Sequence, residues 1–368
     1  MRKVRITAKH LQLLIALQEG PLDRLEELAK RVNMSRTTVA HYLKWLSGED
    51  SSSEKRYFRV VPDFDEGALD LQTVDVFFET PSFQSVKDVE ELCYLHPYTK
   101  FRARCYSGNS EVFAQFRIPT GSENLLDRFF RESKRKGKFT NYRILPTENV
   151  PSLFTVPRLE FWDNESFTWN FDWDEWTQKP GLAGRENYKQ ESTSKLEYLC
   201  KNDIALLRFL SNGMRRKQRF IIEELRSQGI SLSSQEFSRH FKFLRENFIP
   251  RSYVYIDIDA FDLYSNVVLT ADSTNGFSTE LRRKLLSNPI PFHSTLKATD
   301  SYLFWYLRLP PSHLSTLLYY LHERVDNLRV SMIDHEKSKV YGLWSEAFDE
   351  TKKVWRIDTD FLLCRNSE

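Results

Sequence analysis

Apolar positions near the start of the chain recur at helical spacing. Between residues 6 and 18 the side chains of Leu11, Leu14 and Leu17 fall roughly on one helical face, and Gly20-Pro21 ends the run. A second amphipathic helix is predicted over 22–32 and a third over 35–46. Three short helices in this order predict a small helical module rather than one long helix.

The connection between the second and third helices carries turn chemistry. Ala29 is small, Asn33 tolerates the left-handed backbone conformation, Ser35 is a good N-cap, and Val39 follows on the inner face of the third helix. Two helices that cross at close range need this combination, which is typical of a helix-turn-helix. A generic three-helix bundle is the alternative. The Ser-rich and basic stretch over 48–64 predicts a wing.

The same order of elements returns from about residue 196. Helices are predicted over 195–210, 219–230 and 231–247, and the strand over 248–259 predicts a second wing. Ser227 stands where the first copy has Ala29, and residues 215–218 lengthen the first turn. The second copy therefore keeps the predicted fold, while its contacts with DNA are less firmly indicated.

Alternating and helical patterns follow each helical module in one order, βαββαβ. The first set covers residues 65–145 and the second covers residues 260–336. This order predicts a four-stranded antiparallel sheet with both helices on one face, the ferredoxin-like unit. The fold class is α+β, with two winged helix-turn-helix modules alternating with two ferredoxin-like modules in a pseudo-twofold tandem repeat that carries added aromatic β-hairpins.

The predicted boundaries divide the chain into six parts. They are a winged helix-turn-helix at 1–62, a ferredoxin-like sensor and dimerisation unit at 63–147, an aromatic hairpin and linker at 148–194, a second winged helix-turn-helix at 195–258, a second ferredoxin-like unit at 259–338, and a C-terminal aromatic hairpin at 339–368.

A winged helix followed by a βαββαβ unit resembles the Lrp/AsnC transcription regulators. The resemblance runs over both halves, through the third helices at 34–46 and 232–249 and the hairpins at 96–119 and 289–310. It implies pairing of sensor sheets, here within one chain that acts as a pseudo-dimer, with any further oligomer left open. It also implies an effector site at the sensor turn, where this chain has Gly108, Asn109, Thr299 and Asp300.

Charge supports a nucleic-acid partner. The formal net charge is +2, yet residues 1–60 carry +5 and residues 201–251 carry +6, which leaves −9 on the rest of the chain. No apolar run approaches the ~18 residues of a membrane span, and the N-terminus lacks a signal core, so a cytoplasmic protein is expected. The four cysteines form no CxxC pair, and no cofactor or metal site is predicted.

These features predict sequence-dependent binding of double-stranded DNA by a transcription regulator. The residues expected to read bases are Arg36, Thr37, Thr38, His41 and Lys44, and in the second copy Gln235, Ser238, Arg239 and Lys242. The residues expected to contact phosphates are Lys30, Arg31, Lys55, Arg56, Arg59, Arg215, Arg216, Lys217 and Arg219. Since the two reading helices differ, two unlike half-sites are expected.

The stretch FWDNESFTWNFDWDEW, residues 161–176, holds seven aromatic rings and five carboxylates without a Lys or Arg. Phe167, Trp169, Phe171 and Trp173 alternate with polar residues, which predicts a strand with every ring on one face. A similar aromatic pattern follows over 341–363. The hypothesis is an added hairpin that extends each sensor sheet, with a site for a partner or an aromatic ligand as the alternative.

Two other function classes stay open. One is a protein-binding winged-helix adaptor in a transcription complex. The other is an enzyme, because some relatives of this architecture are haem-pathway decarboxylases that use His and Arg in the sensor cleft. The chain offers His96, His293, His313, His322 and His335 for such a role, but none has metal-ligand spacing and no nucleophile motif occurs. The sequence alone therefore favours a protein that is not an enzyme, with DNA, an effector and the transcription machinery as its partners.

Overall fold

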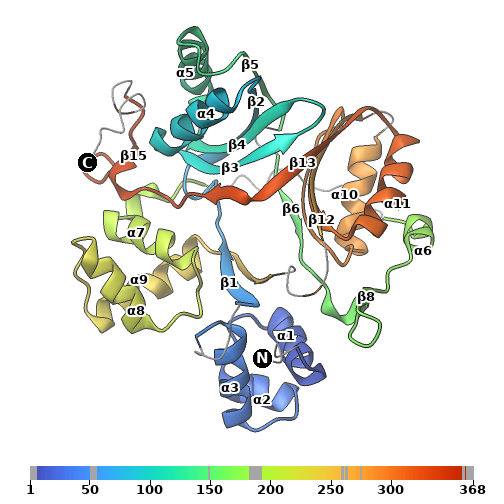
Figure 1. The fold of residues 1–368 in the computed structure, drawn as a ribbon. Coiled ribbons are helices and arrows are strands. Elements are labelled where there is room, and N and C mark those ends of the chain that lie inside the picture. The colour runs from blue at the N-terminus through green and yellow to red at the C-terminus, as the bar shows by residue number, and fades with distance from the viewer. Residues whose placement is uncertain are drawn as a thin grey trace.

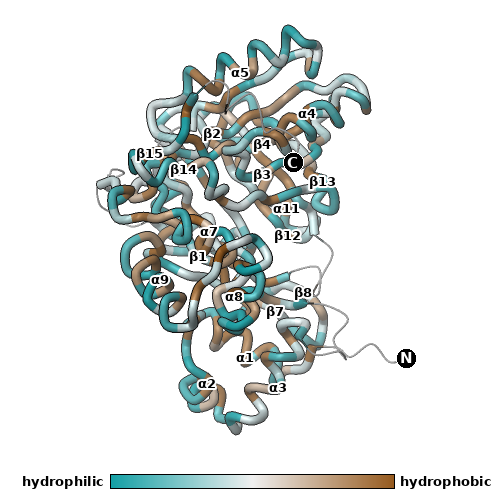
Figure 2. The backbone as a smooth tube through the Cα atoms, turned by 90° about the vertical axis from the view of Figure 1, so that its left-hand side faces the viewer, coloured by the Kyte–Doolittle hydropathy of each residue, from teal (hydrophilic) through white to brown (hydrophobic). Residues whose placement is uncertain are grey.

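The computed structural model describes residues 6–49, 56–147, 150–181, 193–257, 261, 264–273, 276–358 and 361. Within these residues the chain is mixed α+β, with two groups of helices beside a large sheet (Figure 1). Seen a quarter-turn away, α1–α3 still lie at the end of the molecule opposite α4 and α5 (Figure 2). None of the helices described is both long and apolar enough for a membrane crossing.

The first helical group consists of α1 (Ala8–Glu19), α2 (Leu25–Arg31) and α3 (Arg36–Leu46). Asn33 has a φ of 51°, the left-handed conformation expected at the turn, and the Ser35 hydroxyl accepts a hydrogen bond from the Thr38 amide at 3.1 Å. Ala29 and Val39 are buried where α2 and α3 meet. The turn chemistry predicted for this segment is thus confirmed.

The second group follows the 3₁₀ turn η2 (Leu196–Tyr198) and consists of α7 (Lys201–Leu210), α8 (Gln218–Ser227) and α9 (Ser234–Asn247). Gly229 has a φ of 81° in the turn between α8 and α9, and the Ser233 hydroxyl caps α9. Phe237 and Leu244 of α9 are buried. Three helices therefore recur in the second half, although the additional 3₁₀ turn η2 precedes α7.

The two strands predicted as wings pair with each other. Strand β1 (Phe58–Asp63) runs antiparallel to β9 (Arg251–Ile256), with Arg59 opposite Tyr255 and Val60 opposite Val254. The strands predicted for the two wings are present, but a separate wing on each module is not confirmed, and residues 50–55 of the first predicted wing lie outside the described residues. A lone strand leaves its backbone amides and carbonyls unpaired, and the equivalent strand of the other half satisfies them while both valines are buried. The resulting ribbon joins the two helical groups.

The large sheet has nine strands in the order β5-β2-β4-β3-β13-β10-β12-β11-β6. Its first half comprises β2 (Leu71–Glu79), α4 (Phe83–Leu95), β3 (Thr99–Tyr106), β4 (Ser110–Pro119), α5 (Glu123–Arg135) and β5 (Asn141–Ile144). Its second half comprises β10 (Ser265–Ser273), α10 (Phe277–Ser287), β11 (His293–Ala298), β12 (Tyr302–Leu309), α11 (Pro311–His322) and β13 (Val325–Val340). The short β6 (Leu153–Thr155) adds to the edge at β11.

Each half has the strand order of the ferredoxin-like unit, but the two sheets are not separate. The 16-residue strand β13 pairs with β10 of its own half and then with β3 of the first half, and its register shifts between Asp334 and Lys339. In Figure 1 β13 crosses the middle of the molecule between the two halves. The prediction of two four-stranded sheets therefore needs a correction, because hydrogen bonds between β3 and β13 join them into one.

The two halves also pack against each other through their sheet faces. The rings of Phe113 and Phe304 stack with centroids 5.5 Å apart in a buried cluster drawn from both halves. Beside them Lys297 Nζ donates to Asp75 Oδ2 at 2.5 Å, and both side chains are almost fully buried. Gln115 and Thr147 donate to the same carboxylate. The predicted contact between the two sensor units is confirmed.

The aromatic stretch is only partly a hairpin. The 3₁₀ turn η1 (Leu159–Phe161) precedes β7 (Trp162–Asp163) and β8 (Thr168–Trp169), and α6 (Trp173–Gln178) then begins. The strand therefore ends at Trp169, whereas the sequence predicted that it continues to Trp173. Asp172 caps α6 by accepting a hydrogen bond from the Glu175 amide, and this local bond favours a helix over continued alternation.

The C-terminal segment repeats this hairpin in detail. It contains η4 (Ser345–Ala347), β14 (Phe348–Asp349) and β15 (Val354–Trp355). Phe167 and Lys353 each have a φ of 56°, and Asp163 and Asp349 each accept backbone amide hydrogen bonds in the turn. Both hairpins form two-stranded sheets of their own, so the prediction that they extend the sensor sheets is wrong.

Most of the indoles serve as core. Trp162, Trp169, Trp173 and Trp176 are each no more than 6% exposed, whereas Phe167 is 47% exposed. Trp169 and Trp173 pack on the Phe292 ring. The packing role expected for Trp169 and Trp173 is confirmed, although not all rings of the stretch share one face.

The Asp75–Lys297 pair leads to a stability prediction. In Lys297→Met the Asp75 carboxylate stays buried without its cation, so the free energy of unfolding should fall by ~3–5 kcal/mol in a denaturant titration. Arg128→Met, which breaks the solvent-exposed Arg128–Glu132 pair, is the control and should cost under ~1 kcal/mol. The double variant Asp75→Asn/Lys297→Met should recover part of the loss. Equal, small losses for Lys297→Met and the control would contradict this assignment.

Candidate functional site

The expected base-reading residues of the first half lie on the outer face of α3. Arg36, Thr37, His41 and Lys44 are exposed, while the Thr38 hydroxyl is 2.8 Å from the Ser35 hydroxyl at the helix cap. Arg36 Nε lies 3.0 Å from a Glu26 carboxylate oxygen at the surface. The helix thus presents donors to solvent, and contact with bases stays a prediction.

The second recognition helix presents a similar but more self-paired surface. Gln235, Ser238, Arg239 and Lys242 are exposed on α9. The Gln218 amide donates to Ser234 Oγ at 2.9 Å and lies 3.5 Å from Ser238 Oγ, while Lys242 lies 4.0 Å from Glu246. Part of this helix face is therefore occupied by contacts within the chain.

The expected phosphate-contacting residues fall into two groups. Lys30, Arg56, Lys217 and Arg219 are exposed, and Lys55 lies outside the described residues. Arg59 lies over the Tyr255 ring, and Arg31, Arg215 and Arg216 make contacts within the chain. Arg31 donates to the Ala16 carbonyl and pairs with Asp23, and Arg216 pairs with Glu224. Arg215 Nη1 donates to the Pro21 and Asp23 carbonyls of the first helical group. The guanidinium groups of Arg31, Arg215 and Arg216 therefore connect segments within and between the two helical groups.

The expected effector residues lie at two hairpin turns, one on each half, and effector binding there stays a prediction. Gly108 and Asn109 are exposed at the β3–β4 turn, where Gly108 has a φ of 88° and an added Cβ would meet no atom within 4 Å among the described residues. Thr299 and Asp300 lie at the β11–β12 turn, where Asp300 accepts a hydrogen bond from Thr279. Each pair therefore serves a hairpin turn on its own half.

A second candidate site lies where β9, β11, β12 and β13 approach one another. We call it the His293 cluster, and its members are Arg59, Tyr255, His293, Arg308 and His335. His293 is the first residue of β11 and lies opposite Arg308 on β12. Its ring meets the Tyr255 ring edge-on with centroids 5.5 Å apart. His293, Tyr255, Arg59 and His335 are half-buried, whereas Arg308 is 1% exposed.

Hydrogen bonds and stacking order the cluster. Arg308 Nη1 donates to the Tyr255 hydroxyl at 2.5 Å, and Arg308 Nε donates to Asn266 Oδ1 at 2.7 Å. The Arg59 guanidinium lies 4.6 Å from the centre of the Tyr255 ring, and its buried Nε has no hydrogen-bond partner among the described residues. The buried Arg308 thus positions a phenol beside an imidazole and a second guanidinium.

The local field keeps His293 neutral. Burial lowers the pKa of His293 first, and the positive charges of Arg308, His335 and Arg59 lower it further, to about 3. A neutral imidazole among guanidinium groups favours binding of an anion. A carboxylate placed there would offset the positive charges that lower the pKa of His293. The cluster therefore has the character of an anion-binding site with acid–base capacity.

The matching position of the first half is filled by the chain's own carboxylate. Glu66 Oε1 lies 2.8 Å from Lys100 Nζ and 3.1 Å from Arg117 Nε, and Thr73 donates to both Glu66 oxygens at 2.8 Å. Burial raises the pKa of Glu66, but Lys100 and Arg117 outweigh it and hold that pKa well below its ordinary value. Arg117 lies opposite Thr73 as Arg308 lies opposite Asn266, so this half shows how a carboxylate fits the position.

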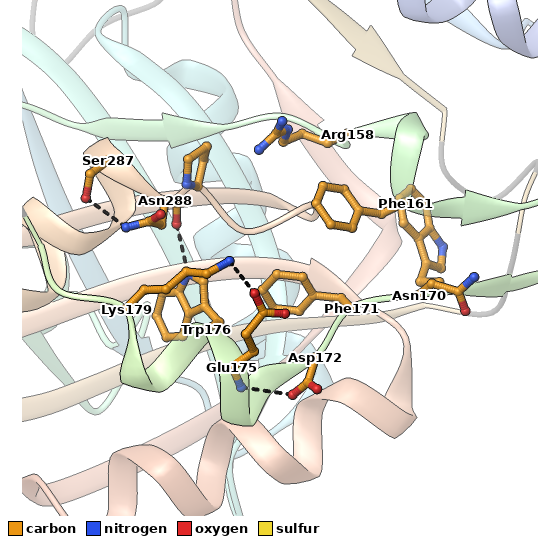
Figure 3. Close-up of a pocket in the computed structure, with 12 residues that line it drawn as sticks. Arg158, Phe161, Asn170, Phe171, Asp172, Glu175, Trp176, Lys179, Ser287 and Asn288 are labelled. Atoms are coloured by element: carbon orange, nitrogen blue, oxygen red, sulfur yellow. Dashed lines mark hydrogen bonds and ion pairs between the residues drawn. The ribbon is translucent and has the colours of Figure 1, made fainter.

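A pocket of about 690 Å³ lies along the aromatic stretch (Figure 3). Its walls include Arg158, Phe171, Trp176 and Asn288. Trp176 Nε1 donates to the Asn288 carbonyl at 2.8 Å, and Lys179 pairs with Glu175 at 2.8 Å. Because these polar groups satisfy one another, the pocket lacks the convergent unsatisfied charge of the His293 cluster.

Sequence reasoning found part of the His293 cluster and missed the rest. His293 and His335 were candidates for a decarboxylase-like role, and Arg59 was assigned to phosphate. Tyr255, Asn266 and Arg308 were missed. The signal available in the sequence was the predicted hairpin 289–310, in which the structure places His293 and Arg308 opposite each other.

Comparisons with solved structures show the fold along nearly the whole chain. The crystal structure of the siroheme decarboxylase NirDL matches with a TM-score of 0.52 and 11% identity, over 94% of this chain and 96% of that one. The same enzyme in co-complex with an iron-uroporphyrin III analogue matches with a TM-score of 0.51 and 11% identity, over 92% of this chain and 94% of that one. At this identity the likeness shows the fold alone.

Smaller regulators match part of the chain. AsnC of E. coli covers 39% of this chain with a TM-score of 0.28 and 15% identity, over 91% of its own length. No family model and no curated protein matches the sequence. The expectation that the chain is not an enzyme is contradicted, because two solved structures that match it along nearly its full length are those of an enzyme.

The depressed pKa of His293 gives a signed prediction for stability. The unfolded chain binds a proton at His293 near pH 6.5 and the folded chain only near pH 3, so this residue makes stability fall as pH drops through that window. In His293→Gln the loss of unfolding free energy between pH 6.5 and pH 4 should be smaller than in the wild type. Denaturant titrations at several pH values measure it. His322→Gln, on the exposed side of α11, is the control, and parallel profiles for all three proteins would contradict the prediction.

Proposed function

We propose that the chain is a decarboxylase that acts on a tetrapyrrole bearing side-chain carboxylates, with its site at the His293 cluster. The observation that carries the proposal is a neutral, half-buried histidine among Tyr255, Arg59 and Arg308. The full-length likeness to a siroheme decarboxylase supports it at the level of fold. The anion-binding character of the cluster suits a substrate that carries several carboxylates.

The half-buried members of the cluster would contact the substrate. Arg59, whose Nε has no partner among the described residues, would pair with a substrate carboxylate. The Tyr255 hydroxyl accepts from Arg308 and so keeps its own hydrogen available for a second oxygen. Arg308 lies behind both and acts as a positioning residue. The Glu66 site of the first half supports this arrangement as an internal example of a bound carboxylate.

Decarboxylation breaks one C–C bond, releases CO₂ and leaves an electron pair on the carbon, which must then receive a proton. A bound carboxylate offsets the neighbouring positive charges, so the pKa of His293 rises from about 3 when substrate enters. The imidazole can then carry the proton that the carbon requires. The positive charges around it favour the substrate carboxylate over water. No oxidant or reductant is needed.

The proposal predicts one active site per chain. In the first half Tyr98 lies beside Arg117, at the place where the second half has His293 beside Arg308. Glu66 fills the position where a substrate carboxylate would lie. The tandem halves would thus divide their roles, with the second half supplying His293, Tyr255 and Arg308 and the first half supplying Arg59. In this proposal the two halves carry the ferredoxin-like modules predicted at 63–147 and 259–338.

Siroheme and iron-uroporphyrin III are the probes that test this function. Absorbance titration should detect binding, and mass spectrometry of the product should detect the loss of CO₂. His293→Gln should retain binding and lower kcat by at least ~10²-fold, as expected when a general acid is removed. His322→Gln is the control. If wild-type protein binds neither tetrapyrrole, or if His293→Gln turns over at the wild-type rate, the proposal is wrong.

A second candidate is DNA binding by α3, favoured by the exposed Arg36, His41 and Lys44 on a helix whose N-cap is correctly formed. Under this candidate double-stranded DNA is the partner, the sensor turns would take an effector, and the chain would serve a transcription regulator or its adaptor complex. The two candidates use different surfaces.

The DNA candidate predicts a specific loss on substitution. Arg36→Ala should weaken binding to a site selected from random duplexes by ~1–3 kcal/mol and relax one base position. Arg56→Ala should weaken all sequences alike and reduce the dependence of affinity on salt. Arg128→Ala, on α5 at the other end of the molecule, is the control. The absence of a selected site, or binding that does not respond to salt, would rule the candidate out.

A further inference from the structure

Three side chains of zinc-binding type meet beside α7, away from the His293 cluster. Cys200 is the N-cap residue of α7, Asp203 lies in the first turn of that helix, and His240 comes from the middle of α9. One ligand atom from each lies within 4.8 Å of the other two. The sequence separation of Asp203 and His240 hides this arrangement from any motif search.

The three groups are already joined through one carboxylate. The Cys200 thiol donates to Asp203 Oδ2 at 3.0 Å, and His240 Nδ1 lies 2.6 Å from Asp203 Oδ1. The Cys200 amide also donates to Oδ2 at 2.9 Å, as in a helix-capping box. A cap needs only that amide contact. The second carboxylate oxygen is instead turned toward an imidazole on another helix.

Access to the cluster is graded. Asp203 is 3% exposed, the His240 side chain is 19% exposed, and Cys200 is half-buried. The carboxylate thus lies at the inner end, with sulfur and nitrogen nearer to solvent. A cation could enter from that side and keep a water molecule on its outer face.

We propose that Cys200, Asp203 and His240 bind one divalent cation of the zinc class. Thiolate and imidazole select zinc, cobalt and related ions over magnesium or calcium. In a tetrahedral site with Zn–S near ~2.3 Å and Zn–N near ~2.0 Å, the ligand atoms are ~3–4 Å apart, so only small movements would be needed. Three protein ligands leave the fourth position to water, the pattern of open zinc sites.

Binding exchanges protons for the cation. The thiol proton leaves to solvent when sulfur becomes a thiolate ligand, and the imidazole presents Nδ1 to the metal with its remaining proton on Nε2. The cation would then tie the start of α7 to α9. It would lie close to the C-terminal hairpin, because Lys353 donates to the carbonyl of Leu199 and Lys201 pairs with Glu346.

Cobalt titration of the full-length chain, stripped of metal with a chelator, tests the proposal. Wild-type protein should develop the near-ultraviolet thiolate-to-cobalt band and the visible bands of a tetrahedral Co²⁺ ion, and added Zn²⁺ should remove both. Cys200→Ser should lose the thiolate band. His240→Gln and Asp203→Asn should lose the tetrahedral visible bands. Zn²⁺ should raise the Tm of the wild type and not that of the variants.

Cys364→Ser is the matched control, because Cys93 and Cys105 are buried and Cys364, outside the described residues, is the remaining cysteine of the sequence. This variant should give the wild-type spectrum. The proposal is overturned if wild-type protein shows no thiolate band, if Cys200→Ser retains it, or if Cys364→Ser removes it. Metal-free circular dichroism of each variant confirms folding, so the loss of a hydrogen-bonded helix cap is distinguished from the loss of a metal ligand.

Discussion

The buried contact between Asp75 and Lys297 constrains how the two halves of the molecule meet. Each charge is removed from water, and each compensates the other across the facing sheets beside Phe113 and Phe304. A displacement of one half would leave a carboxylate or an ammonium group buried alone. The relative position of the halves is thereby tied to one arrangement, and that arrangement brings β3 beside β13 so that one sheet continues into the other.

This fixed arrangement sets up two unlike polar clusters. On the first half Lys100, Arg117 and Thr73 close around Glu66. On the second half the strand β9, held by β1, brings Tyr255 against His293. The two clusters share a strand framework, because Thr73 lies opposite Arg117 as Asn266 lies opposite Arg308, but they differ in their charged side chains. The two copies of a duplicated chain can therefore place different charged groups at the same position of one framework.

Local patterns were predictable from sequence because their causes are local. The left-handed Asn33, the Ser35 cap and the helices around them depend on residues within one or two turns. The burial of Trp169 and Trp173 was also predictable. The end of the aromatic strand was not, since the Asp172 cap competed with the alternating pattern that precedes it.

Features built from distant segments could not be read in the same way. The pairing of β1 with β9 depends on a partner almost 200 residues away, and no property of either strand alone excludes a wing. His293 and Arg308 could be placed opposite each other, whereas Tyr255 and Arg59 required the ribbon between the helical groups.

The strand β13 also has a consequence for biosynthesis. Strand β3 forms the edge of the first half until residues 332–340 pair with it, and Tyr341 then donates its amide to the Lys100 carbonyl. A ribosome must therefore synthesise more than nine-tenths of the 368 residues before this edge is covered. Throughout that time the nascent first half presents an open β-edge that can pair with other chains. The speed of translation and the access of chaperones to β3 therefore affect how much of the nascent chain reaches the folded state.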